Sequence, residues 1–150
     1  MAFISTFQFK VDRKGRVSVP AEFRPALTKP DFAGVIAFPS PHGAAIRGVT
    51  AEWLERIMAT RDPLDVFGNG TADLALNAAA DMVRLPFDGE GRVLLSKPLT
   101  DYAGIADSAT FVGRMAFFEI WNPEAFAAHH GPVSAAARRA ITEGGGNGRS

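Results

Sequence analysis

The sequence predicts a mainly β fold with short helices, an α+β class in which two tandem repeats form one pseudo-twofold β-core. The first observation behind this prediction is the pattern Asp-x-x-Gly-Arg, which occurs at 12–16 and again at 88–92. The second is a tryptophan downstream of each copy, Trp53 and Trp121. A repeated order of features indicates an internal duplication. Because units of half this length would be marginal alone, we expect the repeats to bury their apolar sheet faces against each other.

The duplication divides the chain into four segments. The first repeat is expected over residues 1–60 and the second over 78–130. A linker is expected over 61–77, where glycines are mixed with an alanine-rich stretch. A flexible C-terminal tail is expected over 131–150, which ends in a glycine-rich run.

The first repeat is expected to begin with a β-hairpin. Residues 6–11 are strand-like, and residues 16–19 alternate polar and apolar side chains at period two. Gly15 is expected to supply the positive φ of the tight connection, and Asp12 to accept hydrogen bonds from backbone amides two residues on. Asp12 and Gly15 are therefore interpreted as turn-structuring residues.

Short helices and strands complete the first repeat. Proline at its first position favours a helix over 20–27, because the missing N–H would be unpaired there. Strands are expected at 34–38 and 44–49, with proline and glycine between them. Thr50 is expected to cap a following helix.

The second repeat is expected to follow the same order, with Asp88 and Gly91 in the turn-structuring positions. Its expected elements are strands at 82–88 and 92–96, a short helix at 99–103, strands at 109–113 and 117–121, and a helix opened by Asn122-Pro123.

Composition predicts a soluble globular protein with a cytoplasmic location. No stretch approaches the ~20 consecutive apolar residues that span a bilayer, so no membrane partner is expected. The N-terminus lacks the features of a secretory signal. The absence of cysteine excludes disulfides and thiolate metal sites.

Charge is balanced over the chain but not evenly distributed. The formal net charge is zero, which argues against indiscriminate coating of nucleic acid. Residues 1–60 carry eight Lys or Arg against five Asp or Glu. Most of this excess lies in and beside the first turn, at Lys10, Arg13, Lys14, Arg16 and Arg24. A charged loop is usually only solvated, but solvation does not require Asp, Gly and Arg at matching places in two copies.

The repeated turns and the Trp-containing helix starts resemble the MraZ family, the two-repeat bacterial members of the AbrB-like swapped-hairpin transcription factors. The similarity covers roughly residues 1–130. In that family the two repeats intertwine, protomers assemble into rings, and the protein binds direct repeats upstream of the division and cell-wall gene cluster. The resemblance therefore implies a DNA-binding transcriptional regulator that is a homo-oligomer and is associated with the nucleoid.

The resemblance also implies roles for particular residues. The Asp and Arg of each copy, Asp12 with Arg16 and Asp88 with Arg92, would mark the functional turns. Lys14 and Arg24 would add cationic contacts in the first repeat. The second repeat departs from the family at Leu95-Ser96-Lys97-Pro98 and Thr100, where Ile or Leu before Pro and then Arg are usual, and it has Gly89 and Glu90 in place of Arg13 and Lys14.

The residues themselves support a DNA contact by the first turn. A hairpin can place Arg13, Lys14 and Arg16 at its tip, and a two-stranded ribbon fits the major groove. Arginine can pair bidentately with guanine, which is worth about 1–3 kcal/mol of discrimination, whereas lysine more often meets phosphate. A ring would multiply such weak sites against tandem DNA repeats.

An equally plausible interpretation gives the arginines a structural role. Arg16 and Arg92 could pair with Asp12 and Asp88, or with a neighbouring subunit, and hold the turns in shape. The candidate DNA-binding residues are Arg13, Lys14, Arg16, Arg24 and Arg92.

Two other functions are considered. The acidic second turn with Glu90 raises the possibility of an assembly or partner-binding protein of the same fold without specific DNA binding. An enzymatic or small-molecule β-core using Asp12 and Asp88 is disfavoured, because an Arg four residues after each Asp favours ionised, structural carboxylates. His42 and the adjacent His129-His130 do not combine a base, a nucleophile and an orienting group. We expect no catalytic site, metal, cofactor or small-molecule substrate.

Overall fold

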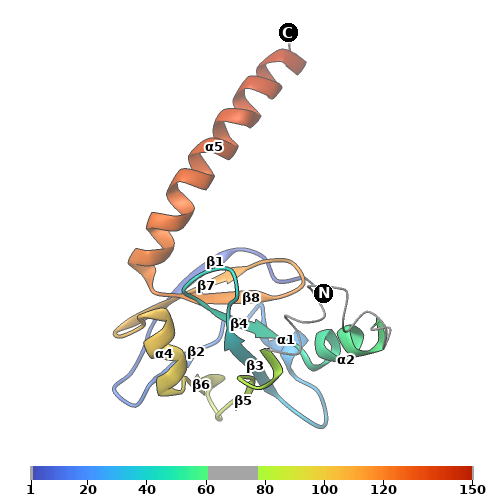
Figure 1. The fold of residues 1–150 in the computed structure, drawn as a ribbon, viewed down its shortest axis with the longest axis vertical. Helices are drawn as coiled ribbons and strands as arrows, with labels where there is room; N and C mark the ends of the chain where they lie inside the picture. The colour runs from blue at the N-terminus through green and yellow to red at the C-terminus, as the bar shows by residue number, and fades with distance from the viewer. Residues whose placement is uncertain (1, 61–77, 150) are drawn as a thin grey trace.

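The computed structural model describes residues 2–60 and 78–149. The linker predicted over 61–77 lies outside the described residues. Figure 1 shows a body of antiparallel strands with short helices, from which one long helix extends. The predicted mainly β fold with short helices is confirmed.

Six antiparallel strands form the main sheet, in the order β1-β7-β8-β4-β3-β5. Their bounds are β1 Thr6–Lys10, β3 Gly34–Pro39, β4 Ile46–Val49, β5 Val83–Pro86, β7 Ser108–Gly113 and β8 Phe118–Trp121. A separate two-stranded ladder is formed by β2 (Arg16–Ser18) and β6 (Arg92–Leu94). The strands β1 and β5 occupy the two edges of the main sheet.

Strand pairing joins the two halves of the chain reciprocally. β1 pairs with β7, which places Phe9 opposite Ala109, and β5 pairs with β3, which places Leu85 opposite Val35. β4 pairs with β8 at the centre of the sheet. In the small ladder the central residues of β2 and β6 lie opposite each other. Each half therefore supplies an edge strand to the other half, and the two fold as one body.

The connection between β1 and β2 differs from the predicted hairpin. Within this described segment a single bridge, between Val11 and Val17, joins the two strands directly. The reason is that β1 takes its hydrogen bonds from β7 and β2 takes them from β6. The alternating pattern identified both strands correctly, but local alternation does not specify the strand partner.

The core between the main sheet and the ladder is rich in phenylalanine. The ring centroid of Phe23 lies 5.1 Å from that of Phe3 and 5.2 Å from that of Phe118. Val17 and Val93, at the centres of β2 and β6, are buried in the same cluster. Burying a side chain of this size is worth roughly 1.5–3 kcal/mol, so the ladder that carries the two turns is firmly attached to the sheet.

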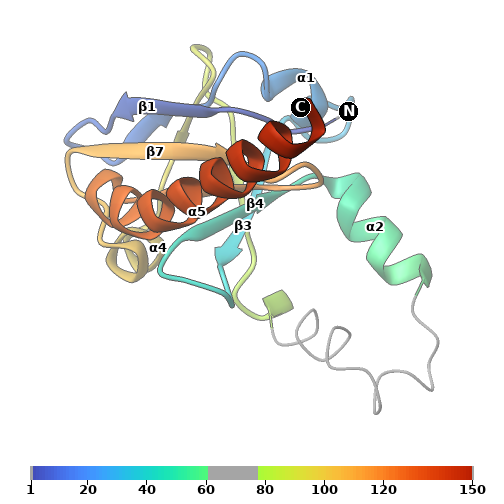
Figure 2. The same cartoon turned by 90° about the horizontal axis from the view of Figure 1, so that it is seen from above.

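Four helices surround the strands in the described ranges: α1 Arg24–Leu27, α2 Ala51–Thr60, α4 Lys97–Ala103 and α5 Pro123–Arg149. Figures 1 and 2 place α2 and α4 on opposite sides of the body. Thr50 caps α2 as predicted, since its Oγ1 accepts a hydrogen bond from the backbone N–H of Trp53 at 2.9 Å. Asn122 caps α5 in the predicted way, because its Oδ1 accepts from the N–H groups of Glu124 and Ala125.

Two helices differ from their predicted extent. α1 begins at Arg24, because the carbonyl of Pro20 accepts from the N–H groups of Phe23 and Arg24 and so closes a turn. α5 continues to Arg149 with Pro132 inside it, through the region predicted to be a tail. Whether that region is flexible stays a prediction. None of the helices in the described ranges is long and apolar enough to cross a membrane.

Candidate nucleic-acid interface

One carboxylate organises the first turn. Asp12 Oδ1 accepts hydrogen bonds from the backbone N–H groups of Lys14 and Arg16, both at 2.9 Å. Asp12 Oδ2 accepts from Nε of Arg16 at 2.7 Å. Gly15 has a φ of 91°, in the left-handed region that favours glycine. These bonds fix both the shape of the turn and the direction of the Arg16 side chain.

The second turn repeats this arrangement atom for atom. Asp88 Oδ1 accepts from the N–H groups of Glu90 and Arg92 at 2.9 and 3.0 Å. Asp88 Oδ2 accepts from Nε of Arg92 at 2.9 Å. Gly91 has a φ of 74°. The shared pattern Asp-x-x-Gly-Arg is thus the sequence form of one turn geometry.

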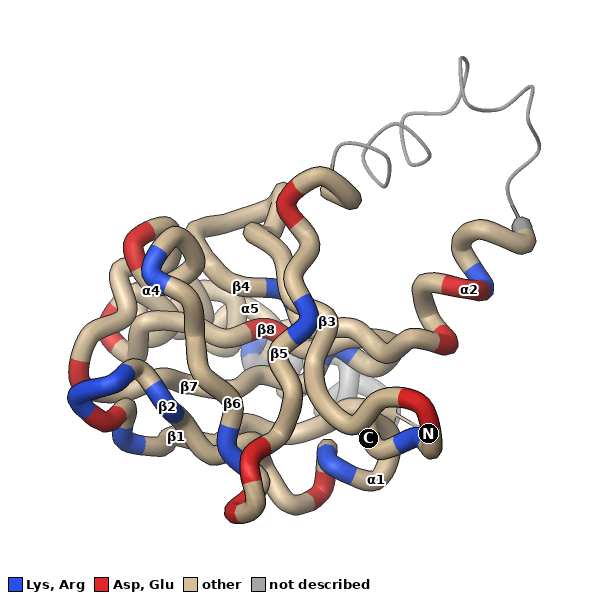
Figure 3. The backbone as a smooth tube through the Cα atoms, turned by 90° about the horizontal axis from the view of Figure 1, so that it is seen from below, with Lys and Arg blue, Asp and Glu red and all other residues tan. Residues whose placement is uncertain are grey.

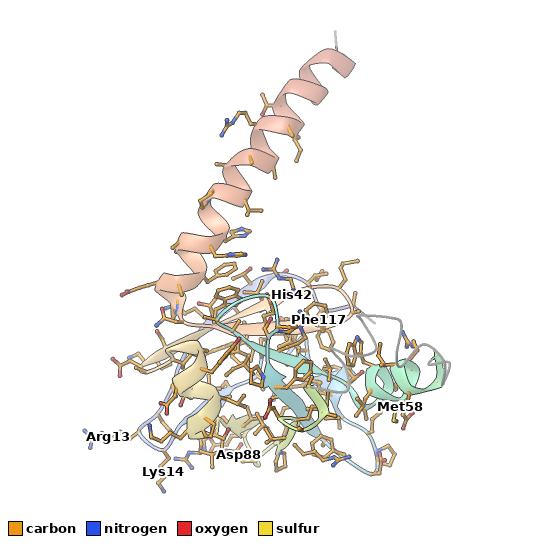
Figure 4. All side chains as sticks on the ribbon, viewed as in Figure 1. Arg13, Lys14, His42, Met58, Asp88 and Phe117 are labelled. Carbon is orange, nitrogen blue, oxygen red and sulfur yellow. The ribbon has the colours of Figure 1, made fainter. Side chains whose placement is uncertain are left out.

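The ladder holds the two turns side by side. Hydrogen bonds cross between them in matching places: the N–H of Leu95 donates to the carbonyl of Gly15, and the N–H of Val19 donates to that of Gly91. Figure 4 shows the labelled residues Arg13, Lys14 and Asp88 at the end of the body away from α5. The two turns together therefore form one surface.

Both aspartates are held in the ionised form. The N–H of Arg16, hydrogen-bonded to the Asp12 carboxylate, lowers the pKa of Asp12 below its usual value. The N–H of Arg92 lowers the pKa of Asp88 in the same way. Each side chain of the corresponding arginine adds to the effect. A carboxylate that stays ionised and accepts three hydrogen bonds is not available as a general acid.

The two arginines have different surroundings. Among the described residues, Asp12 is the one carboxylate within ion-pair distance of Arg16. Arg92 faces three carboxylates, with its nearest nitrogens 2.9 Å from Asp88, 3.6 Å from Glu90 and 3.9 Å from Asp12. These carboxylates raise the pKa of Arg92, with the side-chain hydrogen bond to Asp88 as the largest cause. The guanidinium of Arg16 is consequently the freer of the two to meet an anion.

Arg24 does not lie at its own turn. It lies against the second turn, where a Cβ built on Gly91 would collide with its guanidinium. Its Nε is buried and has no hydrogen-bond partner within the described chain. Arg24 therefore lies across the ladder, against Gly91 of the second turn.

Arg13 and Lys14 are exposed at the tip of the first turn. Figure 3, which views the molecule from below, shows positive and negative segments adjoining at both turns, with a longer run of positive charge beside β2. In the part of the chain that the structure describes, neither Arg13 nor Lys14 forms an ion pair. The tip of the first turn therefore carries unpaired positive charge, whereas the matching tip position of the second turn is occupied by Glu90.

Two further cations near the first turn, Arg84 and Lys97, are not among the residues that the sequence predicts to contact DNA. They line a groove of about 730 Å³ that also includes Lys14, Gly15 and Thr100. The signal in the sequence is Thr100, which lies eight residues after the Arg of its turn, as Arg24 does after Arg16. This departure, already noted in the sequence, accompanies the different surroundings of Gly15 and Gly91.

The other candidates lie away from this surface. Trp121 is buried at the end of β8 and not in a helix, and the ring of His129 stacks on it at 5.0 Å. The ring of Trp53, in the first turn of α2, packs 6.4 Å from that of Phe38. Within residues 2–60 and 78–149, no group of three or more His, Asp or Glu side chains is arranged to hold a metal ion.

Comparisons with known proteins identify relatives along most of the chain. A family model described as "MraZ protein, putative antitoxin-like" matches residues 79–143. The protein named "Transcriptional regulator MraZ" from Rhodospirillum rubrum is 42% identical over 134 residues, which cover 86% of this chain and 84% of that protein. The protein of the same name from Pelagibacter ubique is 40% identical over 124 residues, covering 83% and 80% of the two chains. That from Rickettsia akari is 39% identical over 127 residues and covers 85% of each. The chain belongs to the MraZ family.

Proposed function

We propose that this protein is a DNA-binding transcriptional regulator that contacts promoter DNA through the first turn. Its relatives are named transcriptional regulators, which supports the general function. The observation that carries the proposal is the geometry of Arg16. Its Nε is fixed by Asp12, in a turn whose tip residues Arg13 and Lys14 are exposed. A positioned arginine on a two-stranded ribbon, next to free positive charge, suits the major groove of a duplex.

In this mechanism the residues of the turn have separate roles. The Nη atoms of Arg16 would meet a guanine edge, and its fixed Nε would limit the side-chain entropy lost on binding. Arg13 and Lys14 would contact phosphates and set the register. Asp12 would act indirectly, by holding Arg16 in position.

Self-association is part of the proposal, because one protomer carries few DNA contacts. A ring of protomers on direct repeats upstream of a division and cell-wall gene cluster would add weak sites by avidity. It would also place the protein at the nucleoid. Ile4 and Met115 are 60% and 65% exposed, and a bridge between Phe3 and Met115 brings their segments together. Phe3 is itself buried in the core, so the exposed apolar pair Ile4 and Met115 is the candidate subunit contact.

The surroundings of the second turn favour a second candidate, an oligomeric partner-binding protein without specific DNA binding. Three carboxylates face Arg92, and the side chain of Glu90 is 74% exposed. The exposed negative charge of Glu90 disfavours contact with phosphate at the tip of this turn. The two candidates differ in whether the protein has a salt-dependent preference for its own upstream DNA.

The test of the DNA-binding proposal compares two changes at one position. Arg16→Ala removes the guanidinium, and Arg16→Lys keeps the charge but removes the planar fork. Binding is followed by fluorescence anisotropy with a duplex from upstream of the gene and with a scrambled duplex. We expect Arg16→Ala to weaken binding to the upstream duplex by about 5- to 150-fold, which corresponds to the roughly 1–3 kcal/mol of a bidentate base contact.

Arg16→Lys is expected to lose discrimination between the two duplexes while keeping most of its affinity for the scrambled one. Both variants should keep the mass of the wild-type oligomer. If both bind the upstream duplex as tightly as wild type does, Arg16 does not contact DNA, and the partner-binding candidate becomes the better account.

A further inference from the structure

The two turns share one backbone geometry, but different side chains pack against them. On the second turn, the Arg24 guanidinium lies where a Cβ on Gly91 would be. Thr100 is the sequence counterpart of Arg24 and lines the groove beside the first turn, and its Oγ1 donates a hydrogen bond to the carbonyl of Lys97 in its own helix. A Cβ on Gly15 would meet the carbonyl of Leu95 at 3.2 Å and the side chain of Leu94 at 3.6 Å, and among the described residues no arginine lies over it as Arg24 lies over Gly91. Arg24 therefore fills the space beside the second turn, whereas an open groove remains beside the first turn.

The open side is the groove beside the first turn. Its walls are the turn itself, the edge strand β5, and the segment from the end of β6 into α4, including Leu94 and Thr100. Leu94 is 54% exposed and forms part of its apolar surface. The groove is continuous with the tip that carries Arg13 and Lys14. Whatever the tip binds can therefore extend into it.

The charges along this groove are predominantly positive. Four cations line it, Arg13, Lys14, Arg84 and Lys97, against the single carboxylate of Asp12, which is already bonded to Arg16. Lys97 pairs with Asp101 at 2.9 Å, but both side chains are more than half exposed, so this ion pair is weak and exchangeable. Within the described ranges, Arg84 forms no ion pair.

We propose that this groove holds the phosphate backbone of DNA beside the first turn, with Arg84 and Lys97 as phosphate contacts. The inference rests on the proposed DNA-binding function. It adds two phosphate-contacting residues and specifies the side of the ladder along which the DNA backbone runs. Cations placed on both walls of an open groove suit a line of phosphates, which carries charge at regular intervals. Glu90 gives the opposite turn a negative tip, so the backbone lies on one side of the ladder only.

The test measures how affinity depends on salt in Arg84→Ala, Lys97→Ala and the double variant. The same upstream and scrambled duplexes are titrated at several salt concentrations. Each phosphate contact contributes a slope of about −0.9 to the plot of log affinity against log salt. We expect each single change to weaken binding to both duplexes equally and to reduce the slope by about one, and the double change by about two.

Arg139→Ala is the matched control, because it removes one exposed positive charge from α5. It should leave the slope unchanged. Slopes in the Arg84 and Lys97 variants equal to those of wild type and of the control would overturn the groove assignment while leaving the role of Arg16 intact. If wild type shows no DNA affinity at all, the proposed function itself fails. Circular dichroism checks that the variants remain folded.

Discussion

The carboxylates of Asp12 and Asp88 act at the scale of single residues. Hydrogen bonds from the N–H groups of Arg16 and Arg92 lower their pKa values in the folded protein. A group with a lowered folded pKa stabilises the fold above its unfolded pKa, and this contribution is lost as pH falls through the folded pKa. We therefore expect the free energy of unfolding to decrease as the pH is lowered past about 4, which is the ordinary pKa of an aspartate. Urea unfolding measured above and below that pH tests this.

Asp12→Asn is the variant that isolates the charge. It keeps an oxygen for the N–H groups of Lys14 and Arg16 and removes the titrating group. We expect it to be less stable than wild type near neutral pH and to lose less stability on acidification. If the free energy of unfolding depends on pH in Asp12→Asn and in Asp88→Asn as it does in wild type, these two carboxylates are not the cause of the loss of stability in acid.

Local residue chemistry could be predicted from the sequence, whereas contacts across the fold could not. Asp12 accepts hydrogen bonds from backbone N–H groups no more than four residues away, and Gly15 adopts the positive φ of the same turn. Their geometry therefore follows from their spacing in the sequence. Arg24 lies against Gly91, which is 67 residues away, because the ladder brings them together. No local pattern contains that information, and the proposed phosphate contact of Arg84 likewise depends on how the two halves of the chain pack together.

The start of α5 is an element whose stability depends on one side chain. Asn122 Oδ1 accepts from two N–H groups of the first turn of the helix, and its Nδ2 donates to the carbonyl of Gly104 at 2.6 Å, just after α4. Loss of a cap costs about 1 kcal/mol, and loss of the second hydrogen bond costs about 1 kcal/mol more. We expect Asn122→Ala to lower the free energy of unfolding by about 2 kcal/mol, measured by urea denaturation.

Asn122→Asp separates the two bonds, because it keeps the capping oxygen and removes the donor to Gly104. It should lose about half as much stability as Asn122→Ala. Equal stability of Asn122→Ala and wild type would mean that α5 is not anchored through this residue.

Most elements follow from the sequence, but their partners do not. Continuous apolar runs bounded by turn residues predicted the positions of β3, β7 and β8. The same reasoning assigned β1 and β2 to one hairpin, since adjacent strands usually pair. The actual partners come from the other half of the chain: β1 pairs with β7 and β2 pairs with β6. Because the two halves are repeats, each strand has an equivalent pairing partner in the other half.

At the scale of the whole molecule, a neutral protein is proposed to bind DNA through local charge and assembly. Ile4 and Met115 form the candidate subunit contact. We expect Ile4→Glu to reduce the oligomer mass in analytical ultracentrifugation, because it places a charge in an apolar interface. Ile141→Glu is the matched control, since Ile141 is exposed on α5. An oligomer unchanged by Ile4→Glu would move the subunit contact elsewhere.

The central claim is that this protein binds its own upstream DNA specifically. The most direct measurement is an anisotropy titration of the wild-type protein with the upstream duplex and a scrambled duplex at two salt concentrations. The account predicts tight binding to the upstream duplex alone, weakening as salt rises because counterions are released from the phosphates. Equal weak binding to both duplexes, or no binding to either, would contradict it.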